Sequence, residues 1–220
     1  MRLQTAWYLA IIAKMNTHQT LIDSMIASGV LYSPHLIKAF HRCNRIYFVP
    51  DELQSETYGD YPLSIGMGQT ISQPTTVAIM LELLRPQSGN KVLDIGSGSG
   101  WTTALLALAV EPNGFVEGLE RVPSLVEYGR NSLKRVHVTN ASIDFADPHA
   151  LGKPGHLYDR ILVSASADKL PKTLIEQLKP GGILVIPILE SVWRFTKRDN
   201  GEVSSYELPG FRFVPLITPN

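Results

Sequence analysis

The chain has 220 residues, of which 44% are hydrophobic and 18% are charged, and its formal net charge at pH 7 is zero. These values fit one ordinary globular domain over residues 1–220 and offer no general attraction to a polyanion. Cys43 is the only cysteine, which excludes a structural disulfide within the chain and fits a reducing compartment. We therefore expect a cytoplasmic protein. We also expect a monomer that binds neither nucleic acid nor membranes.

The first third of the sequence is predicted to be helical. Residues 6–13 form an apolar run that is far too short to span a bilayer, and we expect it to begin an N-terminal helix. A second helix is predicted over residues 17–29. A third helix opens at Ser33 and Pro34, with Ser33 as its N-cap and Pro34 in its first turn.

A long irregular segment then separates these helices from the rest of the chain. Residues 48–74 carry many glycine, proline and hydroxyl residues and little periodicity, and a segment of this kind inside a compact domain is usually functional or disordered. An apolar helix over residues 75–84 follows. We therefore divide the chain into a helical and loop region, residues 1–84, and an α/β core, residues 85–220.

From residue 91 onward, strand and helix patterns alternate. Strands are predicted at 91–95, 115–119, 139–144, 159–164 and 182–188, and helices at 101–110, 123–135 and 169–178. This progression predicts a Rossmann-like, mostly parallel, doubly wound sheet that is covered on both faces. The tail differs, because residues 192–197 and 202–207 flank the turn Asp199-Asn200-Gly201, which predicts an antiparallel hairpin. Residues 211–217 predict one more strand.

The stretch Val92–Gly100 places a short apolar strand, an acid and three alternating glycines directly before a predicted helix. Glycine has no Cβ, so the backbone N–H groups of this loop can approach a ligand closely, and the helix N-terminus adds a positive dipole end. We therefore expect a nucleotide-like cofactor here. The loop residues expected to contact it are Gly96, Ser97, Gly98, Ser99 and Gly100.

The spacing of the loop favours S-adenosyl-L-methionine over a dinucleotide. The dinucleotide fingerprint is G-x-G-x-x-G, and its last small residue allows close packing of helix on strand. Here that position holds Trp101, whose indole would hold helix and strand apart, and Asp94 would meet a pyrophosphate as a like charge. S-adenosyl-L-methionine has a cationic end and no phosphate. The serine-hydrolase elbow G-x-S-x-G does not fit, because its central position is Gly98.

Acidic residues follow three successive predicted strands. Asp94 ends the first strand, and Glu120 ends the second, where folds of this type place an acid on ribose hydroxyls. Asp147 follows the third strand and could accept a hydrogen bond from an adenine amine. The alternatives are an ordinary exposed side chain for Glu120 and a turn residue before Pro148 for Asp147. The histidines show no paired spacing with cysteine or acids, so we expect no metal site.

Two segments outside the glycine loop carry a more specific pattern. Residues 61–74 read Y-P-L-S-I-G-M-G-Q-T-I-S-Q-P, and residues 45–50 read R-I-Y-F-V-P. They resemble the signatures P-L-P-I-G-x-G-Q-T-I-S-x-P and R-x-x-F-V-P of the protein-L-isoaspartate O-methyltransferase family. Further similar segments are 92–100, 158–163, Pro171, 177–182, 186–187 and 213–216. Together these matches cover nearly the whole chain, from about residue 20 to residue 217.

The resemblance implies an activity and a set of site residues. Members of this family move a methyl group from S-adenosyl-L-methionine to the α-carboxylate of L-isoaspartyl residues in damaged proteins, and the ester then collapses to a succinimide. The active-site serine of the family falls on Ser72, and Gln69, Thr70 and Ile71 match positions that line the cofactor. A carboxylate with a pKa near 4 is already ionised at neutral pH, so this chemistry needs no acid–base pair. The alternative for Ser72 is an N-cap of the following helix.

Some positions depart from the family pattern. Ser64 replaces a proline of the signature, Ala146-Asp147-Pro148 replaces the usual G-D-G, and residues 189–193 lack the usual glycine-rich loop. These departures affect the predicted acceptor specificity more than the predicted binding of the cofactor. Two alternatives therefore stay open: a methyltransferase of the same fold that acts on another acceptor, and a non-catalytic cofactor-binding module. A dehydrogenase is a more remote alternative.

Overall fold

The computed structural model describes residues 17–218, so the apolar run at residues 6–13 lies outside the described part of the chain. Helices and a small hairpin make up its first part. In chain order they are α2 (His18–Ala27), α3 (Pro34–Arg42), the 3₁₀ helices η1 (Arg45–Phe48) and η2 (Asp51–Glu56), the antiparallel strands β1 (Leu63–Gly66) and β2 (Gln69–Ile71), and α4 (Pro74–Leu84). The helices predicted over residues 17–29, from Ser33 and over residues 75–84 are confirmed, whereas the hairpin inside residues 48–74 was not predicted.

Local hydrogen bonds fix the N-terminal helices. α2 begins after Thr17, whose hydroxyl accepts a hydrogen bond from the backbone N–H of Thr20 at 3.2 Å. Ser33 precedes α3 as predicted, but its side chain does not cap that helix. Its hydroxyl donates to the Oε2 of Glu82 of α4 at 2.5 Å, and the Oε1 of Glu82 accepts the backbone N–H groups of Tyr32 and Ser33. The buried Glu82 therefore joins the α2–α3 connection to α4.

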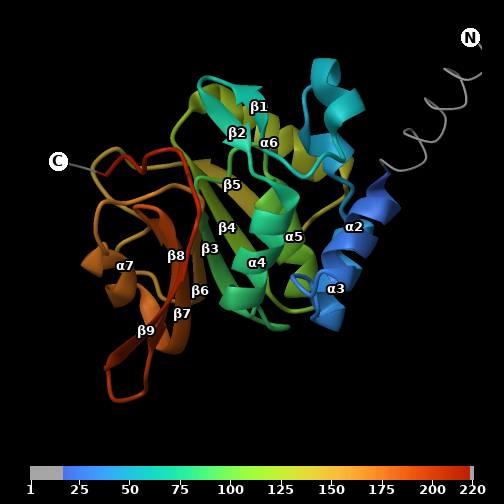
Figure 1. The fold of residues 1–220 in the computed structure, drawn as a ribbon. Coiled ribbons are helices and arrows are strands. Elements are labelled where there is room, and N and C mark those ends of the chain that lie inside the picture. The colour runs from blue at the N-terminus through green and yellow to red at the C-terminus, as the bar shows by residue number, and fades with distance from the viewer. Residues whose placement is uncertain (1–16, 219–220) are drawn as a thin grey trace, which may run out of the picture.

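Within the described residues, a seven-stranded sheet forms the centre of the molecule (Figure 1). Its strands are β3 (Lys91–Ile95), β4 (Phe115–Glu120), β5 (Ala141–Phe145), β6 (Tyr158–Val163), β7 (Leu178–Ile188), β8 (Ser191–Lys197) and β9 (Val203–Pro209). Their spatial order is β5-β4-β3-β6-β7-β8-β9, with parallel pairing from β5 to β7 and antiparallel pairing of β8 and β9. The predicted Rossmann-like sheet and its C-terminal hairpin are confirmed.

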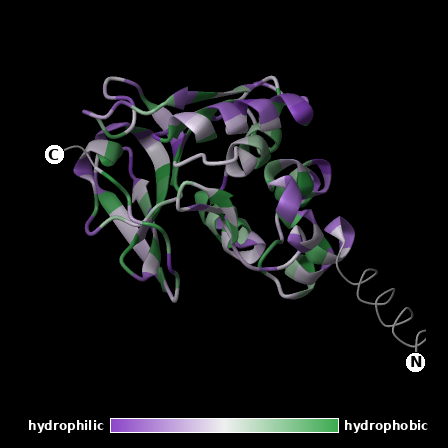
Figure 2. Ribbon diagram, turned by 90° about the horizontal axis from the view of Figure 1, so that it is seen from above, coloured by the Kyte–Doolittle hydropathy of each residue, from purple (hydrophilic) through white to green (hydrophobic). Residues whose placement is uncertain are grey.

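The two faces of the sheet are covered unequally. Alternate strand residues point to opposite faces. Val92 and Val116 lie on the face that packs with α2 to α4, α5 (Trp101–Ala109) and α6 (Pro123–Arg135). Leu93 and Leu119 lie on the other face, which is covered by the short α7 (Lys172–Glu176) and by apolar residues of neighbouring loops. Figure 2 shows hydrophilic residues concentrated on the outward turns of the helices.

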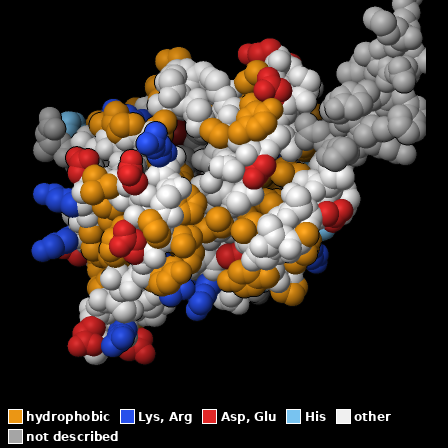
Figure 3. All heavy atoms as spheres, viewed as in Figure 1, with side chains coloured by type: hydrophobic (Ala, Val, Ile, Leu, Met, Phe, Trp, Pro, Cys, Tyr) orange, Lys and Arg blue, Asp and Glu red, His pale blue; other side chains and the backbone are white. Residues whose placement is uncertain are grey.

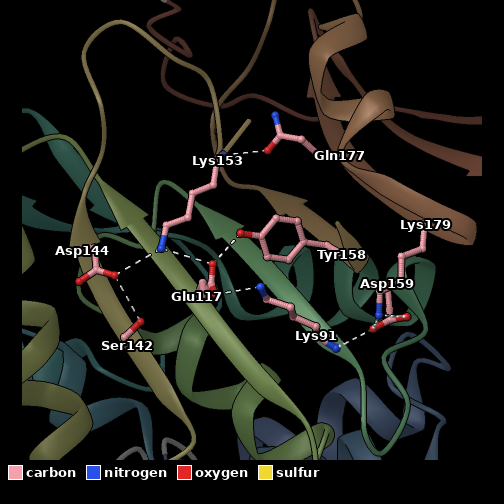
Figure 4. Close-up of polar contacts among 9 residues, drawn as sticks. All are labelled: Lys91, Glu117, Ser142, Asp144, Lys153, Tyr158, Asp159, Gln177 and Lys179. Carbon is pink, nitrogen blue, oxygen red and sulfur yellow. Dashed lines mark hydrogen bonds and ion pairs between the residues drawn. The ribbon is translucent and has the colours of Figure 1, made fainter. Parts of the chain in front are cut away.

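On this second face, a polar network lies over β3 to β6 (Figure 4). The ammonium of Lys153 lies 3.3 Å from Glu117 on β4 and 3.5 Å from Asp144 on β5. The hydroxyl of Tyr158 on β6 donates to Glu117 at 2.5 Å. Because no helix connects β5 to β6, these side chains cover the strands there, and Lys153 ties the connecting loop to the sheet.

The segment before β7 differs from the prediction. The predicted helix at 169–178 shrinks to the five residues of α7, and β7 begins at Leu178. Lys179, which falls between the predicted helix at 169–178 and the predicted strand at 182–188, lies in the strand, and its ammonium binds Asp159 on β6 at 2.9 Å. Leu178 is fully buried and pairs with Tyr158. This burial and this ion pair hold the backbone extended where the local pattern predicted a helix.

Residues 211–217, predicted as a strand, form within the described chain only an isolated bridge, between Pro215 and Ser166. Proline lacks the N–H group that a regular ladder needs. The backbone N–H of Ser166 donates to Val214 at 2.8 Å, and its carbonyl accepts from Leu216 at 2.7 Å. The segment therefore crosses beside the carboxyl end of β6 instead of extending the sheet.

The face of the molecule in Figure 3 mixes acidic, basic and hydrophobic side chains and carries no broad patch of a single charge. Within residues 17–218, no helix combines the length and the hydrophobicity that crossing a membrane requires. Over the same residues, His, Cys, Asp and Glu form no group of three or more that could hold a metal ion.

Candidate active site

A pocket lies at the carboxyl ends of β3, β4 and β5, beside the point where the strand order reverses between β3 and β6. Ligands of open α/β sheets bind at such switch points. The β1–β2 hairpin lies over this end of the sheet (Figure 1) and lines the pocket through Ile65 and residues 69–72. Residues 214–218 form a further wall.

The loop after β3 requires glycine for its conformation and for space. Gly96, Gly98 and Gly100 have φ values of 79°, 51° and 87°, a region that other residues rarely adopt. A Cβ on Gly100 would lie 3.1 Å from the carbonyl oxygen of Gly129 on α6, and one on Gly98 would lie 3.2 Å from the side chain of Ile65. The loop is therefore packed closely between α6 and the β1–β2 hairpin.

Asp94 supports this loop from behind, because it is fully buried and does not line the pocket. Its Oδ2 accepts hydrogen bonds from the hydroxyls of Thr102 at 2.8 Å and Thr103 at 2.6 Å, in the first turn of α5. Burial raises the pKa of Asp94 to about 6, against the effect of the two hydroxyls, and the charge of Glu120 adds to the rise. Its Oδ1 is buried without a partner among the described residues. Such an oxygen needs a hydrogen-bond donor.

Trp101 joins the glycine loop to the N-terminal helices. Its indole packs edge-on against Phe40 of α3, with ring centroids 5.9 Å apart, and lies 5.3 Å from the guanidinium of Arg45. From the sequence, this indole was expected to lie between helix and strand, and its contacts with α3 and Arg45 were not predicted. The buried Nε1 of Trp101 and the buried Oγ of Ser97 also lack partners among the described residues. Both residues line the pocket.

Glu120 holds the far side of the loop and lines the pocket. Its Oε2 accepts the backbone N–H of Gly98 at 2.9 Å, and its Oε1 accepts those of Arg121 at 2.7 Å and Val122 at 2.9 Å. A carboxylate offers about four lone-pair sites, so acceptor capacity is left for a ligand. The buried Glu120 is therefore not the ordinary exposed side chain of the alternative reading.

Asp147 lies on an exposed loop that borders the pocket. Its Oδ1 accepts the backbone N–H of His149 at 2.8 Å, so it does form a turn, while its side chain stays beside the pocket. The same loop is held from below by the buried Gln177, which accepts the N–H of Lys153 at 2.8 Å and donates to the carbonyl of Leu151 at 2.9 Å. Figure 4 shows Gln177 next to Lys153, whose side chain reaches into the polar network.

Ser72 follows β2 directly and does not act as a cap. The N-cap of α4 is Gln73, which makes no side-chain capping bond. Asp60 serves the first turn of α4 instead, because it accepts the backbone N–H of Thr75 at 2.9 Å and its hydroxyl at 2.7 Å. The capping alternative for Ser72 is therefore wrong. Its hydroxyl makes no hydrogen bond to another described residue.

A buried arginine fixes the backbone around Ser72. Arg45 is fully buried, donates to the carbonyl of Ser72 at 3.1 Å and to that of Thr57 at 2.6 Å, and forms no ion pair with any described residue. Further donations reach the carbonyls of Gly59 and Tyr61 at 3.4 and 3.2 Å. Burial lowers the pKa of Arg45 to about 10. The hydrogen bonds of this one side chain thus hold together the backbone of the irregular segment, residues 57–72.

A second cavity, an open groove of about 1050 Å³, meets the pocket. It runs between the start of α4, the β7–β8 turn and residues 209–214. Thr70, Ser72, Ser164 and Val214 line both cavities. These residues therefore mark the point where a ligand in the pocket and a ligand in the groove would meet. Residues 190 and 191, from the segment that departs from the family pattern, lie on the groove.

The structure gathers most of the residues singled out from the sequence. Those that line the pocket are Gln69, Thr70, Ile71, Ser72, Gly96, Ser97, Gly98, Ser99, Glu120 and Asp147. Asp94 and Gly100 are not among its lining residues. Ser164 and residues 214–218 also line the pocket and were not predicted from the sequence. Ser164 could have been found, because it ends a predicted strand at the same edge of the sheet, whereas residues 211–217 were assigned to a strand.

Comparisons with known proteins show the family to which this chain is similar. Residues 16–220 match the sequence profile of the family described as Protein-L-isoaspartate(D-aspartate) O-methyltransferase (PCMT). The chain is 41% identical over 204 residues to the Protein-L-isoaspartate O-methyltransferase of Methanopyrus kandleri, covering 90% of each chain. It is 40% identical over 201 residues to that of Pyrococcus horikoshii, covering 89% of this chain and 90% of the relative.

Among solved structures, the chain is similar to one from Plasmodium falciparum that is described as a protein-L-isoaspartate O-methyltransferase in complex with S-adenosyl-L-homocysteine. The TM-score is 0.81 and the sequence identity is 28%, over 92% of this chain and 99% of that one. The likeness therefore extends over nearly the whole of that structure and most of this chain.

Proposed function

The chain belongs to the protein-L-isoaspartate(D-aspartate) O-methyltransferase family, and we propose that it transfers a methyl group from S-adenosyl-L-methionine to the α-carboxylate of L-isoaspartyl residues in damaged proteins. The methyl ester then closes to a succinimide, which reopens partly to aspartate. The observation that carries this proposal is the junction of two cavities at Ser72, with a nucleotide-type pocket on one side and an open groove on the other.

The pocket fits S-adenosyl-L-methionine. The unpaired Oγ of Ser97 lines the pocket and offers a hydrogen-bond acceptor to the cationic end that such a ligand carries, and the buried Asp94, with its unpaired Oδ1, adds a carboxylate behind the glycine loop. Glu120 keeps acceptor capacity for ribose hydroxyls, and Asp147 borders the same pocket, where it can accept from the adenine amine. When bound, S-adenosyl-L-methionine supplies an electrophilic methyl group on a sulfonium sulfur.

The groove fits a polypeptide better than a small molecule. Its volume of about 1050 Å³ is slightly above the range of small-molecule pockets, about 300–1000 Å³, and it is an open groove and not an enclosed cavity. A polypeptide that lies in it would place a side chain at the junction. This argues for the isoaspartyl acceptor over a small-molecule acceptor.

The residues at the junction have to orient the acceptor, since an ionised carboxylate needs no base. Ser72 can donate its hydroxyl to the acceptor carboxylate, because that hydroxyl is not used within the described chain. Ile71 and Val214 are apolar walls that exclude water from the carboxylate. Alignment and the exclusion of water are the contributions that such a transfer requires from the protein.

The proposal is tested by the nature of the product. The purified protein is incubated with S-adenosyl-L-methionine and an isoaspartyl peptide, and the product is followed by mass spectrometry. We expect a methyl ester on the isoaspartyl α-carboxylate that decays to the succinimide in mild base. A base-stable methyl group on nitrogen or on another residue would support the alternative acceptor, and cofactor binding without any transfer would support the non-catalytic module.

A further inference from the structure

We propose that Ser164 is a second acceptor-binding residue, which donates its hydroxyl to the same carboxylate as Ser72 from a different element that lines the junction. This inference rests on the proposed function, because it assumes that a carboxylate occupies the junction. It deepens that function by naming the pair of neutral donors that would hold the acceptor.

The position of Ser164 is fixed by the sheet. It follows the last residue of β6, and its backbone N–H donates to the carbonyl of Ile95 at 2.9 Å, which ties it to the end of β3. Its Cβ lies 3.8 Å from the place where a Cβ on Gly96 would be. The residue therefore stands beside the glycine loop, at the switch point between β3 and β6.

The hydroxyl of Ser164 is available to a ligand. The side chain is half-buried and lines both cavities, yet its Oγ makes no hydrogen bond to another described residue. Ser166, two residues further on, behaves differently, because its hydroxyl donates to the carbonyl of Leu189 at 3.0 Å. A serine hydroxyl in this segment can thus bond to the backbone, whereas the hydroxyl of Ser164 makes no such bond among the described residues.

Ser72 and Ser164 come from different parts of the fold. Ser72 follows the β1–β2 hairpin and is held by Arg45, whereas Ser164 belongs to the central sheet. A carboxylate has two oxygens that each accept more than one hydrogen bond. Two hydroxyl donors on different elements would therefore fix both the position and the orientation of the acceptor carboxylate.

The charges near the junction favour neutral donors. Arg121 lines the pocket and Arg212 lines the groove, but neither lines both cavities. Arg212 is almost fully exposed and faces Glu190 at 3.7 Å. A cation on the acceptor carboxylate would stabilise its charge and weaken it as a nucleophile. Two neutral hydroxyl donors hold the carboxylate in place and reduce its nucleophilicity less than a cation would.

The test compares Ser164→Ala, Ser164→Thr and Ser72→Ala with the unmodified protein, and uses Ser142→Ala as the control. Ser142 is a serine of β5 that lines neither cavity. Binding of an isoaspartyl peptide to the protein loaded with S-adenosyl-L-homocysteine is measured by calorimetry, and kcat and KM are measured separately. A hydrogen bond to a charged group corresponds to roughly a tenfold to hundredfold change in affinity.

We expect Ser164→Ala to weaken peptide binding about tenfold or more and to leave the affinity for S-adenosyl-L-homocysteine within about twofold. Ser164→Thr should retain most of the peptide affinity, because it keeps the hydroxyl. The loss in the double variant with Ser72→Ala should not equal the sum of the single losses, because both donors act on one carboxylate.

Two results would overturn the inference while leaving the proposed function intact. One is unchanged peptide binding and turnover in Ser164→Ala when the unmodified protein methylates the isoaspartyl peptide. The other is a loss of S-adenosyl-L-homocysteine affinity as large as the loss of peptide affinity, which would place Ser164 on the cofactor. If the unmodified protein methylates no isoaspartyl peptide, the proposed function fails and this inference fails with it.

Discussion

The guanidinium of Arg45 donates a hydrogen bond to the main-chain carbonyl of Ser72 at 3.1 Å while it lies 5.3 Å from the ring of Trp101. One buried cation thus joins the β1–β2 region, which carries Ser72, to the helix that follows the glycine loop. Stacking on an indole and donation to several carbonyls compensate in part for the burial of its charge.

We expect Arg45→Ala to lower the free energy of unfolding by about 3 kcal/mol or more, because several buried carbonyls would lose their donor. The affinity for the isoaspartyl peptide should fall as well, since the backbone at Ser72 would no longer be held. Urea denaturation and peptide titration measure the two effects. Arg42→Ala is the matched control, because Arg42 forms an exposed ion pair with Glu111 and should contribute less than about 1 kcal/mol. Equal effects of the two variants would contradict this role of Arg45.

Asp94→Asn should stabilise the free protein at neutral pH. Burial raises the pKa of Asp94 to about 6 from an ordinary value near 4, so the folded protein binds this proton more tightly than the unfolded chain. The contribution of this group to stability therefore decreases as the pH rises from about 4 to about 6. At pH 7 the cost is on the order of 3 kcal/mol, and the variant would remove it.

Urea denaturation between pH 4 and pH 7.5 checks this expectation, because the advantage of Asp94→Asn should shrink toward pH 4. The same variant should bind S-adenosyl-L-homocysteine about tenfold more weakly, since the negative charge behind the glycine loop no longer attracts the ammonium of the ligand. A variant that binds the ligand normally would remove Asp94 from the cofactor site.

Ser72→Ala should slow turnover about tenfold or more and leave the fold and the affinity for S-adenosyl-L-homocysteine unchanged. The hydroxyl of Ser72 neither caps α4 nor binds another described residue, so its loss should not affect the stability. Asp60→Ala offers the contrast, because it removes the actual cap and should cost about 1 kcal/mol of stability. Normal turnover in Ser72→Ala, measured by steady-state kinetics, would exclude Ser72 from the transfer.

Gly152→Ala should damage the pocket loop more than Gly155→Ala. Both glycines have positive φ, 75° and 85°, so both substitutions carry the same kind of backbone cost. A Cβ on Gly152 would clash with the Oε1 of Gln177, whereas a Cβ on Gly155 would meet nothing within 4 Å. Displacement of Gln177 would free the loop that carries Asp147. We expect weaker binding of S-adenosyl-L-homocysteine only in Gly152→Ala, and equal affinities in the two variants would contradict the role of Gln177.

Much of the sheet and of the glycine loop could be predicted because their signals are local. The alternation of hydrophobic residues and the glycines at 96, 98 and 100 are read within a few positions of the chain. The β1–β2 hairpin was missed because its strands are only four and three residues long and its turn places Met67 at a positive φ of 55°. The end of helix α7 was missed because the buried side chain of Leu178 keeps the backbone extended.

The parts of the site that could not be predicted depend on contacts between distant residues. Arg45 binds carbonyls 12 to 27 positions away, and Glu82 binds the N–H groups of Tyr32 and Ser33 about fifty positions away. Neither pattern has a local signal. The resemblance of residues 61–74 to a family signature indicated Ser72, but the groove that meets it depends on where residues 209–214 cross the sheet.

The most direct test of the account compares two peptides of identical sequence, one with an L-isoaspartyl residue and one with the normal aspartyl residue at the same position. Both are incubated with the purified protein and S-adenosyl-L-methionine that carries a labelled methyl group, and the base-labile label is counted over time. We predict rapid labelling of the isoaspartyl peptide and no labelling of its aspartyl twin above background. Equal labelling of both peptides, or labelling of neither while the cofactor still binds, would contradict the account.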